Sequence, residues 1–291
     1  MKKKKKEITI KRDFTEEDLP HNRFQVFFDI VKIRYDVLFK TALVLFLTII
    51  PLVIALFTRN VMLGKLDDAL INGELTSEAY RSSVFQLQSI FVFIEVFCLL
   101  LFSIPISGLI RVYRLLTFYD GLIFLNDFFQ GIKDNFKQVF VVFLIDSLAF
   151  IVSKIAITYL IYSNINDFLS TIIFFLPAFL SLVVILPISI LHIDQVSIYN
   201  NKYSDNVKNA FFLYLKRGYI ELPISLAIIS PLFLLLIKTI YMPIVVLLFY
   251  AIVWLPFIIL IAYLIGNNIF DKFINEKQYP EIFDKGIYRI K

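Results

Sequence analysis

Three ionisable side chains inside long apolar stretches are the residues best placed to do chemistry in this sequence: Glu95, Asp146 and Lys154. A charge in the middle of a membrane is costly, so such residues commonly pair with each other or line a path for ions or polar substrates. Asp146 and Lys154 are eight residues apart, which places them about 80° apart around one helix. They cannot pair with each other at the i,i+4 spacing, but Lys154 could reach Glu95 on a neighbouring helix.

Two interpretations of these residues follow, a polar path for a substrate or for protons and a structural ion pair, and we favour the second. His192 lies beside Asp194, and we expect a helix-capping or interfacial role for it. Glu221 and Lys238 stand at the two ends of one apolar stretch and are expected at the membrane interface. The sequence contains no H-E-x-x-H, G-x-S-x-G, Walker or G-x-G-x-x-G motif. We therefore expect no enzymatic activity, no cofactor and no metal site.

The composition indicates a membrane protein. Of the 291 residues, 59% are hydrophobic and 18% are charged, whereas soluble domains carry about 25% charged residues. The single cysteine, Cys98, excludes an internal disulfide and a cysteine-based metal cluster, and we expect it to serve in packing.

Six apolar blocks are long enough to cross a bilayer, which takes about 20 residues per helix. They are 37–57, 84–106, 139–162, 168–190, 221–240 and 243–265. The segments between them alternate in basic content, with 23 Lys and Arg residues on one side and three on the other. Because basic residues stay in the cytoplasm, we expect both termini to be cytoplasmic, which agrees with an even number of spans.

The segments outside the spans have simpler expected roles. The basic start of the chain, in residues 1–23, predicts a cytoplasmic tail that contacts anionic lipid rather than nucleic acid. Residues 278–291 form a second cytoplasmic tail. The polar segment 58–83 lies outside, where it is either a ligand-binding lid or a solvated connection that extends the second span, and Thr76 or Ser77 is expected to cap that helix.

Three similar segments indicate an internal repeat within a membrane domain of residues 24–277. "FFDIVKIRYDVL", "FFQGIKDNFKQV" and "FFLYLKRGYIEL" begin at residues 27, 128 and 211, each just before the first, third or fifth span. "IPISGL", "LPISIL" and "LPFIIL" end the second, fourth and sixth spans. We predict an all-α fold of three hairpins, at about 24–110, 125–191 and 208–265, each preceded by an amphipathic cytoplasmic entry helix. Lys32, Lys133 and Lys216 are the interfacial lysines of these helices, which either lie on the membrane as elbows or dock a partner.

The segments "NDFFQGIKDNFKQVFVVFLI", "NVKNAFFLYLKRGYIELP" and "AYLIGNNIFDKFI" resemble the YesL-like family of bacterial multi-pass membrane proteins. The resemblance runs from about residue 25 to 277, and the chain departs from it by an extra polar loop and span around residues 58–104. It implies a location in the bacterial inner membrane and an accessory role beside carbohydrate ABC transporters, and it carries over no catalytic residue.

These observations together predict a non-enzymatic accessory or scaffold protein with the lipid bilayer and ABC transporter subunits as partners and no nucleic acid. The alternative is a transporter for a small or lipid-like solute. A continuous polar lining through Glu95, Asp146 and Lys154 would favour the transporter, and a solid apolar core would favour the scaffold.

Overall fold

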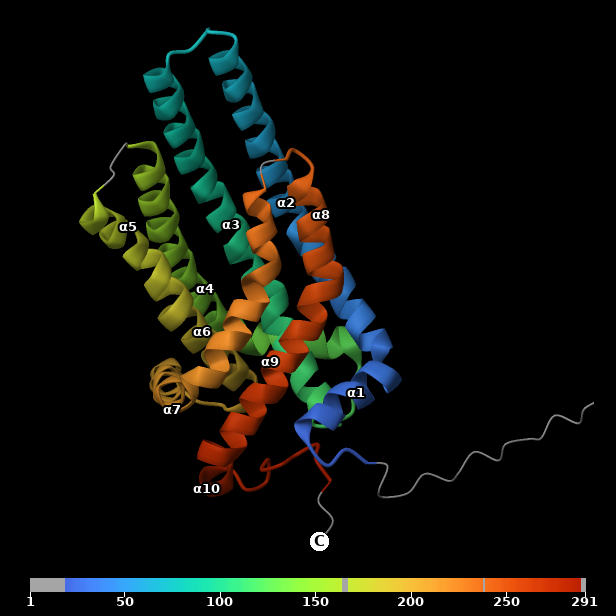
Figure 1. The fold of residues 1–291 in the computed structure, drawn as a ribbon. Helices are drawn as coiled ribbons and strands as arrows, with labels where there is room; N and C mark the ends of the chain where they lie inside the picture. Colours follow the sequence, from blue (N-terminus) through green and yellow to red (C-terminus); the bar gives the residue numbers. More distant parts are fainter. Residues whose placement is uncertain (1–18, 164–166, 238, 289–291) are drawn as a thin grey trace, which may run out of the picture.

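The computed structural model describes residues 19–163, 167–237 and 239–288. Every regular element in these residues is helical (Figure 1). In chain order the elements are α1 (Arg23–Ile33), α2 (Tyr35–Ile71), α3 (Ser77–Thr117), α4 (Phe124–Tyr162), α5 (Phe168–Leu180), the π-helix η2 (Ser181–Ile185), α6 (Leu186–Ile198), α7 (Tyr203–Ile229), the 3₁₀-helix η3 (Ser230–Leu236), α8 (Met242–Phe249), the π-helix η4 (Tyr250–Trp254), α9 (Leu255–Phe270), the π-helix η5 (Asp271–Asn275) and α10 (Glu276–Gln278).

Six helical stretches are long and apolar enough to cross a membrane, as the sequence predicts, and the chain is a multi-pass membrane protein. The stretches are Tyr35–Ile71, Ser77–Thr117, Phe124–Tyr162, Phe168–Ile198, Tyr203–Leu236 and Met242–Gln278. Helices suit this setting because they satisfy their backbone hydrogen bonds within the segment, where no water is present. The two described ends of the chain meet at one end of the bundle, where the Tyr288 N–H donates to the Pro20 carbonyl over 2.8 Å. We call this the terminal end.

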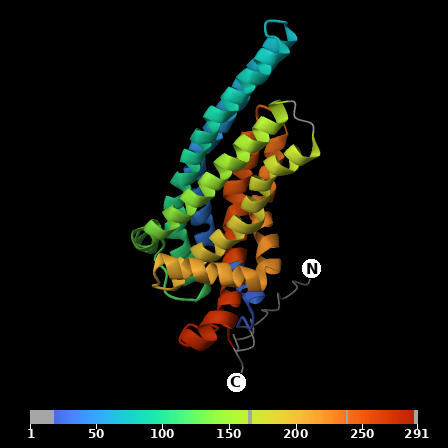
Figure 2. The same cartoon turned by 90° about the vertical axis from the view of Figure 1, so that its left-hand side faces the viewer.

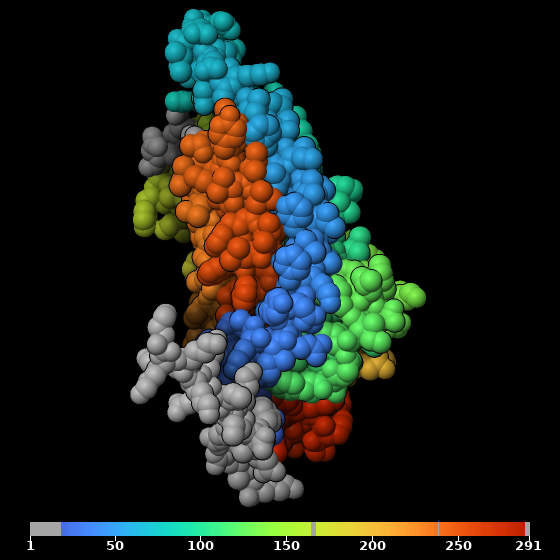
Figure 3. Space-filling model, turned by 90° about the vertical axis from the view of Figure 1, so that its right-hand side faces the viewer, coloured from blue at the N-terminus to red at the C-terminus, as the bar shows by residue number. Residues whose placement is uncertain are grey.

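A long arm projects from the opposite end of the bundle (Figures 1 and 3). It consists of the second half of α2, the turn at 72–76 and the first half of α3. At 1.5 Å per residue the 37 residues of α2 span about 55 Å, and a bilayer core is only about 30 Å thick. The Tyr80 hydroxyl donates to Asp67 Oδ1 over 2.5 Å and ties the two helices together. Thr76 caps α3 by accepting the Ala79 N–H, so the expected extension and cap are present.

The contact between α3 and α4 is unusually close because glycines meet there. A Cβ on Gly131 would lie 2.8 Å from the Gly108 carbonyl oxygen, and one on Gly108 would lie 2.5 Å from the Phe128 ring. Asn135 Nδ2 adds a hydrogen bond to the Ser107 carbonyl at 3.1 Å. This pair of helices therefore forms a fixed wall of the bundle.

The three expected entry helices behave differently. α1 is separated from α2 at Arg34 (φ −118°, ψ 29°), and α7 is broken at Arg217 (φ −137°, ψ 17°), where its first part lies across the bundle before the chain turns (Figure 2). The second segment, 128–139, forms no separate helix but is continuous with α4. The glycine contact holds one side of this segment against α3, while Phe129 on another side stays exposed. The threefold repeat itself stays a prediction.

Two prolines account for the π-helices η2 and η4. Each π-helix ends two residues before a proline, Pro187 in α6 and Pro256 in α9. A proline has no N–H, and its ring clashes with the carbonyl four residues earlier, so the helix widens ahead of it. The 3₁₀-helix η3 likewise begins beside Pro231.

Candidate intramembrane site

Glu95 lies at the centre of a buried charge cluster that joins three spans. Its side chain on α3 is 4% exposed. Arg59 of α2 donates from Nη1 to Glu95 Oε1. Lys154 Nζ of α4 lies 3.5 Å from Glu95 Oε2, so the expected contact between these two residues is present. The cluster holds two positive charges and one negative charge, and it fixes α2, α3 and α4 relative to one another.

Sequence reasoning missed Arg59 and assigned it to the outer segment. The structure continues α2 to Ile71, so Arg59 is inside the helix and only 9% exposed. Its place was readable from helical spacing, because the buried residues Leu45, Ile49 and Leu56 continue on one face to Arg59. The end of the apolar block does not mark the end of the helix.

Asp146 does not belong to this cluster. Ser189 of α6 donates to Asp146 Oδ1 over 2.7 Å. Eight residues separate Asp146 from Lys154, which corresponds to about 12 Å along α4. Asp146 therefore lies nearer the terminal end, while Lys154 lies nearer the arm.

A cavity of about 560 Å³ lies among the six spans, and residues of all six line it. Its lining is mostly apolar, and the charged residues in it are Asp146, Lys154 and Asp194. The polar side chains are separated from one another along the cavity, so they do not form a continuous polar path. The cavity itself means that the space between the spans is not a solid apolar core. A concave, largely apolar space with a few convergent polar groups is typical of a small-molecule site.

Irregular helix turns contribute to the wall of this cavity at three places. Ser181 of η2, Leu232 of η3 and Tyr250 of η4 all line it. Irregular turns inside helices occur frequently at functional sites because they shift side chains away from regular spacing. Their convergence on one cavity marks it as the candidate site.

The fourth span is the most loosely packed wall of the cavity. None of the residues in its most apolar stretch is buried. Its side chains face either the outside of the bundle or the cavity. Ser181 and Ser189 are among those that line the cavity. This span therefore separates the cavity from the bilayer with a single layer of helix.

His192 and Glu221, which the sequence assigns to capping or interfacial positions, are both buried inside the bundle. His192 is 2% exposed and its ring centre lies 4.8 Å from that of Tyr203, and Glu221 is 1% exposed. Asp194, the neighbour of His192, is also buried. The first part of α7 crosses beneath α6 before the break at Arg217, and its Tyr203 packs against His192 (Figure 2). Lys238, the partner expected at the other end of the span, lies outside the described residues.

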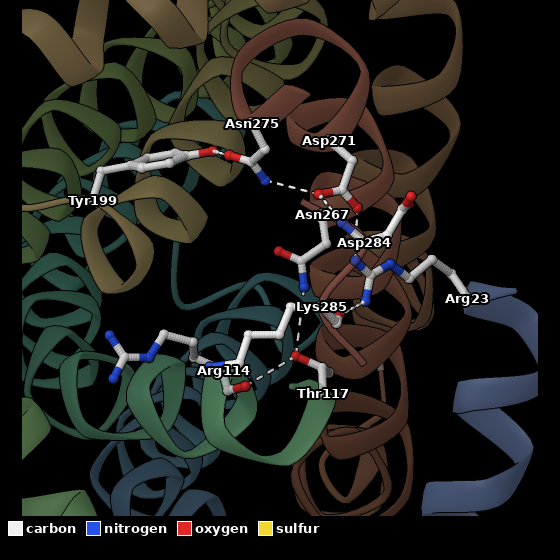
Figure 4. A network of polar contacts seen from close by, with 9 residues as sticks. All are labelled: Arg23, Arg114, Thr117, Tyr199, Asn267, Asp271, Asn275, Asp284 and Lys285. Atoms are coloured by element: carbon white, nitrogen blue, oxygen red, sulfur yellow. Dashed lines mark hydrogen bonds and ion pairs between the residues drawn. The ribbon is translucent and has the colours of Figure 1, made fainter. Parts of the chain in front are cut away.

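A polar network closes the terminal end (Figure 4). Arg23 Nη2 contacts Asp271 Oδ2 at 2.6 Å, and its Nη1 donates to the Lys285 carbonyl over 2.7 Å. Asp271 also accepts from Asn275, which in turn accepts the hydroxyl of Tyr199. Burial, and next the nearby carboxylate of Asp271, raise the pKa of Tyr199, so its hydroxyl stays protonated and remains a donor. The network fastens α1 and the residues after α10 to the last span.

The three candidate interfacial lysines, Lys32, Lys133 and Lys216, are all exposed. Lys216 Nζ lies 5.5 Å from the centre of the Phe212 ring. The phenylalanine at the second position of each repeated segment is also exposed in all three copies. These residues are therefore available to a membrane surface and take no part in the cavity.

The chain matches no family model, no curated protein and no solved structure. The resemblance to the YesL-like family rests on the segments quoted above, and the functional argument rests on the geometry of the cavity.

Proposed function

We propose that this protein binds an amphipathic, lipid-like solute inside the membrane and acts as a transporter for it. The cavity of about 560 Å³ among the six spans carries this proposal. Its volume falls within the range of about 300–1,000 Å³ that is common for small-molecule sites. The apolar lining suits the body of an amphipathic molecule.

Lys154 provides the group that would recognise the head of the solute. Its side chain is 30% exposed and lines the cavity, and one of its contacts is Glu95. An ammonium carries three donors, so donors remain for an acidic or oxygen-rich head group. Glu95, itself bound by Arg59, holds the ammonium in place, which reduces the entropy lost when the solute binds.

Entry from the bilayer through the fourth span fits the loose packing of that span. Its π-helix η2 lies midway along the span, and π-turns inside helices are frequent at functional sites. We place the terminal end on the cytoplasmic side of a bacterial inner membrane, because the basic residues concentrate in the segments at that end. The three hairpin repeats would then share one orientation.

The test is native mass spectrometry of the purified protein after exchange into a mild detergent. We expect one retained amphiphile in the wild type and its loss in Ser181→Phe, which fills the cavity. Leu180→Phe is the matched control, because Leu180 is the exposed neighbour of Ser181 and does not line the cavity. Absence of a retained amphiphile in the wild type, or equal retention in all three proteins, would overturn the proposal.

The arm favours a second function, that of a non-enzymatic accessory or scaffold subunit of a carbohydrate ABC transporter. A tied helical hairpin beyond the membrane offers a surface that a solute carrier does not need. This candidate also agrees with the family resemblance. Replacement of residues 62–80 by a short glycine linker should abolish co-purification with sugar-transporter subunits while the cavity ligand is still retained. Co-purification that survives the deletion would exclude the arm as the contact.

A further inference from the structure

Two neighbouring helices of the cavity wall carry polar side chains at matching positions. On α4 these residues are Asp146 and Lys154, and on the fourth span they are Ser189 and Ser181. All four line the cavity. On each helix the two residues are eight positions apart, which corresponds to about 12 Å along the helix axis.

The antiparallel course of these helices brings the polar residues together at two heights in the cavity. The Ser189 hydroxyl donates to Asp146 Oδ1 over 2.7 Å, which fixes the register of the two helices. Because α4 packs along all three elements of the fourth span, Ser181 then stands opposite Lys154. We call Asp146 with Ser189 the aspartate level, and Lys154 with Ser181 the lysine level.

The two levels carry opposite charge. At the lysine level the Lys154 ammonium contacts Glu95, which Arg59 also binds, so that this cluster keeps one positive charge in excess. At the aspartate level, Asp146 forms no ion pair with any residue that the structure describes. Among the described residues only Ser189 donates to its carboxylate, at Oδ1. The other oxygen, Oδ2, is left for a further donor.

A second carboxylate adds negative charge to the same half of the cavity. Asp194 lines the cavity five residues beyond Ser189 on α6, toward the terminal end. It is 5% exposed, and its Oδ2 atom has no hydrogen-bond partner in the part of the chain that the structure describes. A buried charge without a partner is costly, so a cation would be stabilised here. No group of three His, Cys, Asp or Glu side chains in the described residues could hold a metal ion, which favours an organic cation.

The wall between the two levels is apolar. Phe150 lies halfway between the charged residues of α4, and Leu182 and Ile185 line the same stretch on the fourth span. The two serines of α4 that line the cavity, Ser147 and Ser153, each stand directly beside one of the charged residues and so belong to the levels. An apolar chain therefore fits between the levels, with one polar group at each end.

We propose that the solute of this cavity is an amphiphile with two heads, an acidic group at the lysine level and a cationic group at the aspartate level, about 12 Å apart. The acidic head accepts a hydrogen bond from Lys154 Nζ, and the cationic head donates one to Asp146 Oδ2. An apolar chain that ends in a carboxylate and in an amine has this chemistry. The inference rests on the proposed function, because it names the second end of the same solute.

The binding of matched probes to the full-length protein in a mild detergent tests this inference. The probes are an ω-amino fatty acid whose ends are about 12 Å apart, and the plain fatty acid and the alkylamine of the same length. Native mass spectrometry measures their dissociation constants. We expect the wild type to bind the ω-amino fatty acid about tenfold more tightly than the fatty acid, as one hydrogen bond between charged groups provides. A shorter ω-amino fatty acid, with ends about 6 Å apart, should lose this preference because it cannot reach both levels.

Variants at the two levels should change the preference in opposite ways. In Asp146→Asn the dissociation constants of the ω-amino fatty acid and the fatty acid should become about equal, whereas Asp146→Glu keeps a carboxylate and should keep the preference. Lys154→Met should weaken the fatty acid relative to the alkylamine. The control, Asp205→Asn, changes an exposed carboxylate of α7 outside the cavity and should behave as the wild type.

The outcomes separate this inference from the proposed function. Equal binding of the fatty acid and the ω-amino fatty acid by the wild type would overturn the inference alone, because it means that Asp146 holds a proton rather than the cationic head. A preference that survives in Asp146→Asn would also overturn it. Failure of every probe to bind, while the wild type retains an amphiphile from the membrane, would exclude the two-headed solute and leave the proposed function standing. Failure of every probe with no retained amphiphile would overturn both.

Discussion

Replacing Glu95 by glutamine should destabilise the protein more than replacing Glu95 and Arg59 together. In Glu95→Gln the guanidinium of Arg59 stays buried without its carboxylate. Breaking a buried pair by removing one partner costs about 3–5 kcal/mol, whereas removing both leaves no lone charge. We expect a loss of about 3–5 kcal/mol for Glu95→Gln and recovery of more than half of it in the double variant with Arg59→Met.

Lys154 should couple to Glu95 more weakly than Arg59 does. Unit charges 3.5 Å apart attract by about 5 kcal/mol at an effective dielectric constant of about 20. Desolvation of both groups offsets most of this attraction. We therefore expect a coupling energy of about 1–2 kcal/mol between Lys154→Met and Glu95→Gln.

The assay is thermal unfolding of the purified variants in one detergent, arranged as two double-mutant cycles. The matched control is the pair Asp36 and Lys40, which has a similar separation of 3.1 Å but side chains that are about half exposed. Its coupling energy should stay below about 1 kcal/mol. If the Glu95 cycles are additive like the control, the charge cluster does not stabilise the bundle and our reasoning about it is refuted.

Two further predictions concern packing and topology. Gly131→Ala should lower the free energy of unfolding by about 1–3 kcal/mol, because its methyl group would overlap the Gly108 carbonyl and force α3 and α4 apart. The control Gly64→Ala meets open space in α2 and should not lower the unfolding temperature. Equal losses of stability in the two variants would contradict the close contact. Topology can be tested with single cysteines at the exposed positions Lys65 and Lys202, in a background without the native cysteine. On intact cells, we expect an impermeant maleimide to label position 65 only. Labelling at both positions would be incompatible with the six spans.

The spans and one contact of the site could be read from the sequence because both follow from local geometry. An apolar block of about 20 residues fixes a span, and a lone carboxylate in such a block needs a partner, which led to Lys154. The same reasoning failed for Arg59. It took the last apolar residue as the end of the helix, whereas backbone hydrogen bonding carries α2 fourteen residues past Phe57 to Ile71.

Tertiary arrangement decided the features that the sequence did not reveal. Glu221 borders an apolar block and was assigned to the interface, yet it follows the bend of α7 at Arg217 by four residues and is 1% exposed. The cavity depends on how six helices meet, and no pattern within one helix reports that. The prolines after η2 and η4 were visible, but their effect on the cavity wall required the positions of the neighbouring spans.

The arm has a mechanical consequence. It is stiff, since Tyr80 and Asp67 join its two helices, and it is anchored where Arg59 meets Glu95. From Arg59 to Ile71 the rise of α2 is about 18 Å, so a rotation of about 10° at the anchor would displace the tip by about 3 Å. Lys154 joins this anchor to the cavity, so the arm has the layout of a lever whose short end lies at the cavity. A rotation of the arm that is too small to change how the spans pack would therefore still move its tip by about 3 Å.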